Sequence, residues 1–184
     1  MKLSQMISAL VLPTALLFCG SALADSNRGF FAGVGASAVN VDDSPSFHKA
    51  NLWTAEIFGG YKHNAWLGGE VRYSEGLGNE ELRLEADVPS TVKMDIDNSM
   101  SVYYRAEAVN QTGSFYALLG YTDLEYTVVG NGATATISED DFSWGLGAGF
   151  KIAPKINLNF EYRSLIHVQD QRFTTITTSL DYRF

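Results

Sequence analysis

The chain has 184 residues, and its 21 Asp and Glu outnumber its 13 Lys and Arg, which gives a formal net charge of −8 at pH 7. This acidic balance argues against a nucleic-acid partner, because binding to phosphates requires an excess of Lys and Arg. Beyond its first residues the sequence has no apolar run of about 18 residues, so no transmembrane helix is expected. Membrane-spanning β-strands remain compatible with the composition, because apolar and polar residues alternate along them.

The N-terminal segment, residues 1–24, has the form of a signal peptide. A lysine at the second position precedes an apolar run over residues 6–18, and Ala22-Leu23-Ala24 resembles the small-residue pattern of a cleavage site. We expect export and cleavage between Ala24 and Asp25. The single cysteine, Cys19, lies inside this segment, so the mature domain over residues 25–184 is expected to have no disulfide.

The rest of the chain divides into segments in which aromatic, β-branched and glycine residues alternate with polar ones. Clusters of turn-forming residues separate these segments. In chain order the pattern predicts strands at Gly29–Val41, Leu52–His63, Trp66–Leu77, Asp97–Asn110, Ser114–Thr127, Phe142–Ile152, Ile156–Val168 and Phe173–Phe184. Because no helical period is present, the pattern predicts an all-β fold, an eight-stranded antiparallel up-and-down transmembrane β-barrel.

The alternation is clearest in the last three segments. Between Phe142 and Ile152, for example, every second residue is large and apolar or Ala, and the residues between them are Ser143, three glycines and Lys151. The first and fifth segments are ambiguous, because Phe30-Phe31 and the run over residues 116–119 place apolar side chains on both faces. The orientation of these two strands stays open.

The predicted connections alternate in length. The joins at residues 63–65, 110–113 and 153–155 are short, whereas those at 42–51, 78–96 and 128–141 are longer and 169–172 is intermediate. This order is typical of a membrane barrel with both termini in the periplasm, short periplasmic turns and longer outer loops. A soluble sandwich has no reason to sort its loops in this way.

Most predicted strands carry charged residues on the face opposite their aromatic residues. A Lys or Arg facing lipid at the midplane costs about 2–4 kcal/mol, so we expect the aromatic face in lipid and the charges in the lumen. The lumen of eight strands is only wide enough to be filled by side chains, which predicts a paired charge network that closes it. The expected members are Glu56, Lys62, Glu70, Arg72, Arg105, Glu107, Lys151, Glu161, Arg163, Asp181 and Arg183.

Glycines recur at every second position in two of the predicted strands. They would leave room for long arginines from the facing wall. They are Gly145, Gly147 and Gly149 and, in one register of the first strand, Gly33 and Gly35. Their spacing lacks the pattern of a nucleotide-binding loop, and no helix follows. No cofactor is therefore expected.

With these features, the mature chain resembles the OmpA-type and OmpX-type family of small outer-membrane barrels over essentially its whole length. The most specific part is the end, where Leu180, Tyr182 and Phe184 resemble the carboxyl-terminal signal that the outer-membrane assembly machinery reads in this family. The resemblance implies a location in the outer membrane of a Gram-negative bacterium. It does not extend to the peptidoglycan-binding domain of OmpA proteins, so we expect no role in tethering the cell wall.

Some barrels in this membrane are lipid-modifying enzymes, and the deacylases among them use a His and a Ser two residues apart on one strand. The residues two positions after His48, His63 and His167 are Ala50, Ala65 and Gln169, none of which is a nucleophile. Ser164, His167 and Asp170 lie close in sequence, but a period of two places Ser164 and His167 on opposite faces of a strand. We therefore expect neither an enzyme nor catalytic residues.

The predicted outer loops are strongly acidic, with eleven carboxylates against four bases. This pattern favours a solvated, repulsive surface over cation bridges to lipopolysaccharide, because calcium sites need organised ligand spacing. The acids are Asp42, Asp43, Glu80, Glu81, Glu85, Asp87, Asp95, Glu139, Asp140, Asp141 and Asp170, and the bases are Lys49, Arg83, Lys93 and Arg172.

The leading hypothesis is a monomeric, non-enzymatic outer-membrane barrel with a structural or adhesin-like role, with lipid, lipopolysaccharide and the assembly machinery as partners and an unidentified ligand at the loops. The alternatives are a soluble periplasmic lipocalin-like binder, a lipid-modifying enzyme and a narrow ion channel. The lipocalin-like fold would present the same alternation with its two faces exchanged.

Overall fold

The computed structural model describes residues 28–42, 50–78, 80–84, 90–130, 133–168 and 171–184. Within these ranges no helix is long and apolar enough to cross a membrane. The predicted signal peptide lies outside the described residues. The strands are β1 (Gly29–Asp42), β2 (Ala50–Lys62), β3 (Leu67–Gly76), β4 (Glu80–Leu84), β5 (Ser90–Val109), β6 (Gly113–Gly130), β7 (Ala133–Ala153), β8 (Ile156–Val168) and β9 (Gln171–Arg183).

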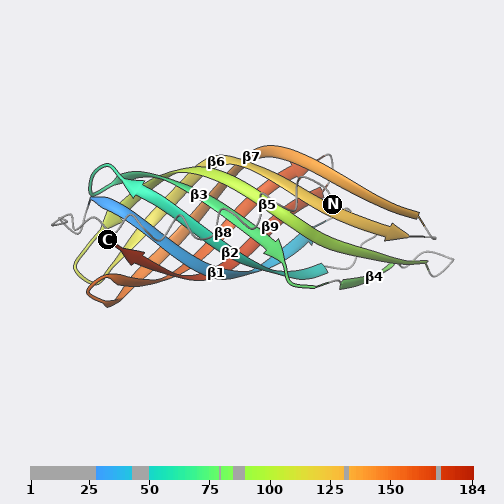
Figure 1. Cartoon of the computed structure of the whole chain (residues 1–184), viewed down its shortest axis with the longest axis horizontal. Helices are drawn as coiled ribbons and strands as arrows, with labels where there is room; N and C mark the ends of the chain where they lie inside the picture. Colours follow the sequence, from blue (N-terminus) through green and yellow to red (C-terminus); the bar gives the residue numbers. More distant parts are fainter. Residues whose placement is uncertain (1–27, 43–49, 79, 85–89, 131–132, 169–170) are drawn as a thin grey trace, which may run out of the picture.

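All strands belong to one antiparallel sheet that closes on itself (Figure 1). Its order is β3-β2-β1-β9-β8-β7-β6-β5-β4, and pairing between β3 and β5 completes the ring. The short β4 pairs with residues 90–94 of β5, and β3 pairs with residues 98–106 of the same strand. Consequently β3 and β4 occupy one position in the wall in succession, and the predicted eight-stranded barrel is confirmed.

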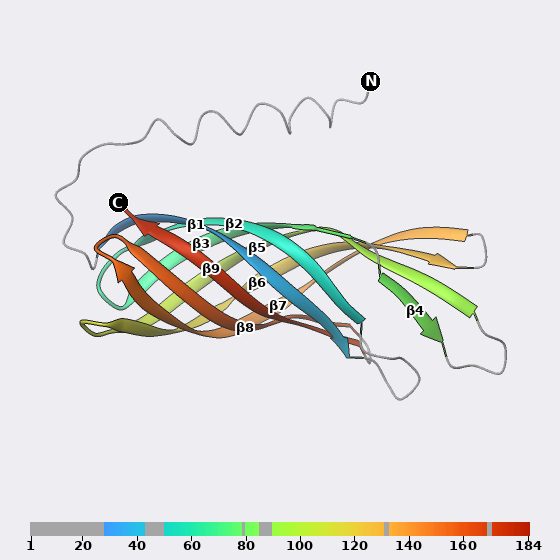
Figure 2. The same ribbon diagram turned by 90° about the horizontal axis from the view of Figure 1, so that it is seen from below.

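Three strands extend well beyond their predicted bounds. β5 begins at Ser90, and β6 and β7 stay paired as far as Gly130 and Ala133. Figure 2 shows the ends of β5, β6 and β7 projecting past those of β1 and β2. The predicted loops at 78–96 and 128–141 are therefore largely strand, and we call the part of β5–β7 formed by residues 95–97, 123–130 and 133–141 the outer sheet.

The ambiguous strands are oriented by burial. In β1, Phe31 faces the lumen and is 2% exposed, while Phe30 faces outward and is 66% exposed. In β6, Tyr116 and Leu118 face inward and Phe115 faces outward. The glycines on the inward face make room for these rings as well as for arginine, because a Cβ at Gly147 would overlap the Tyr116 ring and one at Gly145 would crowd Arg163.

An apolar cluster that the sequence pattern did not predict fills the outer end of the lumen. A β-bulge between Ser164 and Ile166 adds Leu165 to β8, and as a result Leu165 and Ile166 both turn inward. The buried members are Val39, Val41, Leu52, Ile96, Leu124, Tyr126, Leu165, Ile166 and Phe173, with Val128 and Ile137 packed against them. This cluster forms a small core inside the outer end of the barrel.

Candidate functional site

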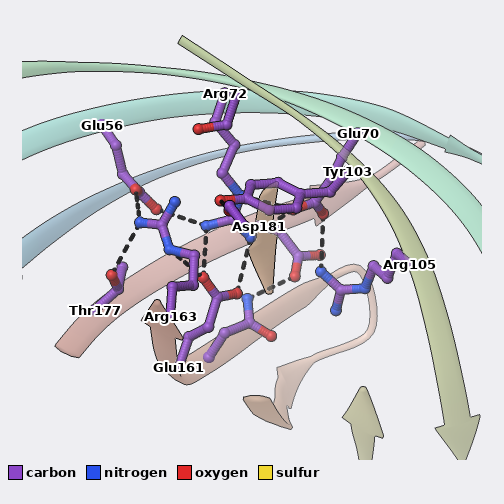
Figure 3. A network of polar contacts seen from close by, with 12 residues as sticks. Glu56, Glu70, Arg72, Tyr103, Arg105, Glu161, Arg163, Thr177 and Asp181 are labelled. Atoms are coloured by element: carbon purple, nitrogen blue, oxygen red, sulfur yellow. Dashed lines mark hydrogen bonds and ion pairs between the residues drawn. The ribbon is translucent and has the colours of Figure 1, made fainter. Parts of the chain in front are cut away.

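Arg72 on β3 stands at the centre of a charge network inside the lumen (Figure 3). Its guanidinium lies 2.9 Å from Glu56, 2.6 Å from Glu70 and 2.8 Å from Glu161. Only 2% of this side chain is exposed. One arginine therefore joins carboxylates from β2 and β3, which are neighbours in the sheet, to a carboxylate from β8 on the opposite side of the barrel.

Two further arginines extend the network. Arg163 on β8 pairs with Glu56 and Glu161 and donates a hydrogen bond of 3.1 Å to Thr177. Arg105 on β5 lies 3.2 Å from Glu70, and its guanidinium carbon is 3.6 Å from the centre of the Tyr116 ring. This stacking contributes a cation–π attraction that is stronger away from water.

We call the end of the barrel that carries the short turns the turn end. Toward this end, Glu107 is the carboxylate that pairs with the neighbouring bases. It lies 2.8 Å from Lys62 and 3.2 Å from Arg183. Arg183 also lies 3.0 Å from Asp181, which accepts further hydrogen bonds from Asn157 and Asn159. Arg183 is the more open part of this group, with 17% of its side chain exposed.

The structure brings ten of the predicted lumen residues together, five acids and five bases, so their formal charges cancel. They are Glu56, Lys62, Glu70, Arg72, Arg105, Glu107, Glu161, Arg163, Asp181 and Arg183. Lys151 is a correction: its side chain is exposed and forms no ion pair with a described residue. The physical reason is its position at the end of β7, beside a second bulge, where the lumen opens to water.

Hydroxyl side chains line the lumen around and beyond the network. Ser37 and Thr177 lie 2.7 Å apart, and Ser101 and Thr122 lie 2.8 Å apart. Beyond Arg163, a cavity of about 10 Å³ separates the network from the apolar cluster. This is about the volume that a single water needs. The lumen is thus blocked twice, first by paired charges and then by the apolar cluster.

The outward face is opposite in character. Large apolar and aromatic side chains such as Leu146, Phe160 and Ile176 are exposed on it, while the charges of the network are buried inside. A soluble lipocalin-like binder requires the reverse arrangement, so the geometry favours lipid around this face. The predicted assembly residues Leu180, Tyr182 and Phe184 all lie on this outward face.

Acidic residues gather where the apolar outward face ends. Asp123 and Asp140 are exposed and directly opposite each other on β6 and β7, and the Tyr121 hydroxyl donates a hydrogen bond to Asp140. No Lys or Arg occurs in the sequence between Arg105 and Lys151. Partial burial and the neighbouring Asp97 raise the pKa of Asp95 above its ordinary value of 3.8. The parts of β6 and β7 in the outer sheet therefore carry acids and no base, while Lys93 of the adjoining β5 is the cross-strand partner of Val129.

The predicted separation of Ser164 and His167 is wrong. The bulge at Leu165 shifts the alternation by one residue, so both Ser164 and His167 lie on the outward side of β8. No hydrogen bond joins their side chains among the described residues, and Asp170 lies outside the described residues, as does His48. His63 is exposed at a turn. In the described part of the chain, no group of three or more His, Cys, Asp or Glu could hold a metal ion.

The chain belongs to the outer membrane protein beta-barrel domain family, whose model matches residues 10–184. This membership places it among outer-membrane barrels. No curated protein sequence matches it.

Several solved structures share the fold. One is Ail, the attachment invasion locus protein of Yersinia pestis, in complex with the heparin analogue sucrose octasulfate. Its sequence is 17% identical to this chain and the TM-score is 0.63. The match covers 86% of this chain and 99% of Ail. Neisserial surface protein A is 15% identical with a TM-score of 0.61, covering 85% and 97%. OprG from Pseudomonas aeruginosa is 12% identical with a TM-score of 0.62, covering 86% and 97%.

Proposed function

We propose that this protein is a non-enzymatic integral barrel of the outer membrane whose lumen is closed and whose outer sheet contacts partners at the cell surface, in the manner of an adhesin. The observation that carries the proposal is the outer sheet itself. Large apolar residues on the outward faces of β6 and β7 reach Tyr121 and Phe142, and the outward residues next along the strands are the acids Asp123 and Asp140. Beyond this level the strands leave the lipid but stay paired.

The outer sheet is held in place from inside. Ile96, Tyr126 and Ile137 belong to or pack against the apolar cluster, which gives the projecting strands a core of their own. Thr127 adds hydrogen bonds to Asp97 at 2.7 Å and to Thr136 at 3.0 Å. A rigid, projecting surface loses little conformational freedom when it binds, which favours a role in recognition.

The charge of the outer sheet favours a basic or neutral partner. Ail was crystallised with a heparin analogue, a sulfated polyanion. In this chain the outer sheet presents Asp123 and Asp140 on its outward face, and Glu139 and Asp141 are half-buried on its other face. Residues 106–150 contain no base. Like charges would repel a polyanion, so this surface is unsuited to heparin.

A variant with a shorter outer sheet, in which the remaining residues of β6 and β7 keep their cross-strand pairing, tests the proposal. Glu125 and Ser138 are cross-strand partners, so replacing residues 126–137 by Asn-Gly should rejoin β6 and β7 through a tight turn. We expect cells that carry the wild-type protein to attach to host matrix and cells that carry the shortened protein at equal surface density not to attach. Heparin should not compete with wild-type attachment. A heat-dependent shift in gel mobility serves as the control for an intact barrel. Equal attachment by both forms would contradict the proposal.

Assembly through the C-terminal strand is part of the same proposal. Phe184 packs against Tyr182 with ring centres 5.0 Å apart, and its amide donates a 3.0 Å hydrogen bond to Phe30. Phe184→Ala keeps the backbone bond, so the purified variant should still fold in detergent while its assembled amount in cells falls. Equal losses in both settings would indicate a purely structural role. We further propose that the barrel acts as a monomer surrounded by lipid and lipopolysaccharide.

Export by the predicted signal peptide can be tested directly. Amino-terminal sequencing of the protein from outer membranes should begin at Asp25. A sequence that begins at Met1 would contradict cleavage.

A further inference from the structure

A cavity of about 760 Å³ opens at the turn end of the barrel, opposite the outer sheet. The residues that line it belong to the short turns and to the ends of β2, β5, β6, β7, β8 and β9. The volume lies within the range of pockets that hold small organic molecules. The charged lining residues are Lys62, Glu107, Lys151 and Arg183, with Asn157 and Asn110 among the neutral ones.

Cations outnumber acids in this lining by three to one. Lys62 and Arg183 both contact the single acid, Glu107, and Arg105 approaches the same carboxylate at 3.5 Å from below. Lys151 forms no ion pair with a described residue. Asp181 also pairs with Arg183, and Glu70 also pairs with Arg105, so the buried charges balance. Lys151 therefore leaves the cavity lining with one excess positive charge, in a chain whose net charge is negative.

The floor of the cavity is built from buried groups. Lys62 is 2% exposed and Glu107 is 5% exposed, although both line the cavity. Behind them Arg105 is buried, and its Nε and Nη2 atoms have no hydrogen-bond acceptor among the described residues. Charges held out of bulk water are screened less than surface charges, so an anion at this floor would be attracted more strongly than one on an exposed lysine.

We propose that this cavity binds a small anion that carries two or more phosphate or carboxylate groups and enters from the periplasm. The anion contacts Lys151 and the exposed side of Arg183, while Lys62 draws it toward the floor. The network around Arg72 closes the cavity from behind, so the anion binds without crossing the barrel. This site is separate from the proposed contact surface at the outer sheet.

Titration of the purified mature barrel in lipid nanodiscs tests the proposal, with pyrophosphate and citrate as the two probes. We expect at least one of them to bind, and the affinity to fall when the ionic strength rises from about 0.01 M to about 0.15 M. Tighter pyrophosphate binding would assign the site to phosphates, and tighter citrate binding would assign it to carboxylates. Binding of neither probe would overturn the proposal.

A matched pair of variants separates this site from general surface charge. Lys151→Glu should weaken binding by at least about tenfold, because it reverses a charge in the cavity. Lys155→Glu makes the same change at an exposed position two residues beyond Ala153 that does not line the cavity, and it should change the affinity by less than about twofold. Both lysines are exposed, so both variants should fold, which the heat-dependent gel shift would verify. Equal losses in the two variants would overturn the proposal.

Nuclear magnetic resonance can locate the bound anion on the protein. The bound anion should shift the amide signals of Asn157 and Asn110 at the cavity and leave those of Ser138 and Asp140 in the outer sheet unchanged. Shifts confined to the outer sheet would contradict the site.

Discussion

Arg72 shows how a single buried side chain can set the packing of the lumen. Its planar guanidinium contacts Glu56, Glu70 and Glu161, an arrangement that the compact ammonium group of lysine cannot reproduce. Breaking a buried ion pair from one side leaves uncompensated charge, which costs more than the pair contributes when intact. Arg72 therefore contributes to stability mainly by neutralising buried carboxylates, and the net attraction of each ion pair contributes less.

Arg72→Ala should destabilise the barrel by about 3–5 kcal/mol, because it removes one cationic partner from each of three buried carboxylates and leaves the network with one uncompensated negative charge. Urea unfolding in lipid vesicles, followed by tryptophan fluorescence, would measure the loss. Arg183→Ala is the matched control, and its effect should be smaller because the Arg183 side chain is 17% exposed. Equal effects of the two variants would mean that the network does not depend on its centre.

Asp95 provides a pH-dependent prediction in the outer sheet. Burial and Asp97 raise its pKa, so the folded protein holds the proton more tightly than the unfolded chain does. Above the pKa of the folded state, the ionised Asp95 carboxylate therefore lowers the stability of the folded protein. This destabilisation disappears as the pH falls below the ordinary pKa of 3.8. Asp95→Asn should make the outer sheet more resistant to proteolysis at pH 7 and leave it unchanged at low pH. A carboxyl resonance of Asp95 that titrates below 3.8 would contradict this.

At the scale of the strand, β7 passes from lipid to water along one outward face. Leu146 and Phe142 on this face are apolar and exposed, whereas Asp140 and Ser138 further along the same face are polar. The strand keeps its pairing with β6 across this boundary, from Phe150 to Ala133. The change in side chains therefore predicts where the bilayer ends.

Two arginine substitutions on this face should locate that boundary. Leu146→Arg should cost about 2–4 kcal/mol, as expected for a base near the bilayer midplane. Ser138→Arg, on the same strand and face but beyond the lipid, should change stability by less than about 0.5 kcal/mol. Unfolding in vesicles measures both. Similar costs at the two positions would mean that the lipid extends over the outer sheet.

For the molecule as a whole, closure of the lumen argues against a channel. An ion would have to pass both the charge network and the apolar cluster, in which Phe173 is fully buried. The cavity at the turn end stops at the network, and the space beyond it holds about one water. The two blocks lie in series and are chemically different.

Single-channel recordings should therefore show no current steps for wild type. Phe173→Ala opens part of the apolar cluster but leaves the network intact, so it should also be silent. Its folding can be checked by the heat-dependent gel shift. Stepwise currents in the wild-type protein would overturn the closed-lumen description.

The amino-acid sequence by itself determined the closed barrel, its strand number and which face holds the charges, because alternation and the cost of charges in lipid act on each strand separately. It could not determine the orientation of β1 and β6, where apolar residues occupy both faces. The bulge at Leu165, the position of Lys151 outside the network and the length of the outer sheet were decided only by the tertiary structure. Each depends on what the facing wall supplies: an apolar cluster for Leu165 and Ile137, and open water for Lys151.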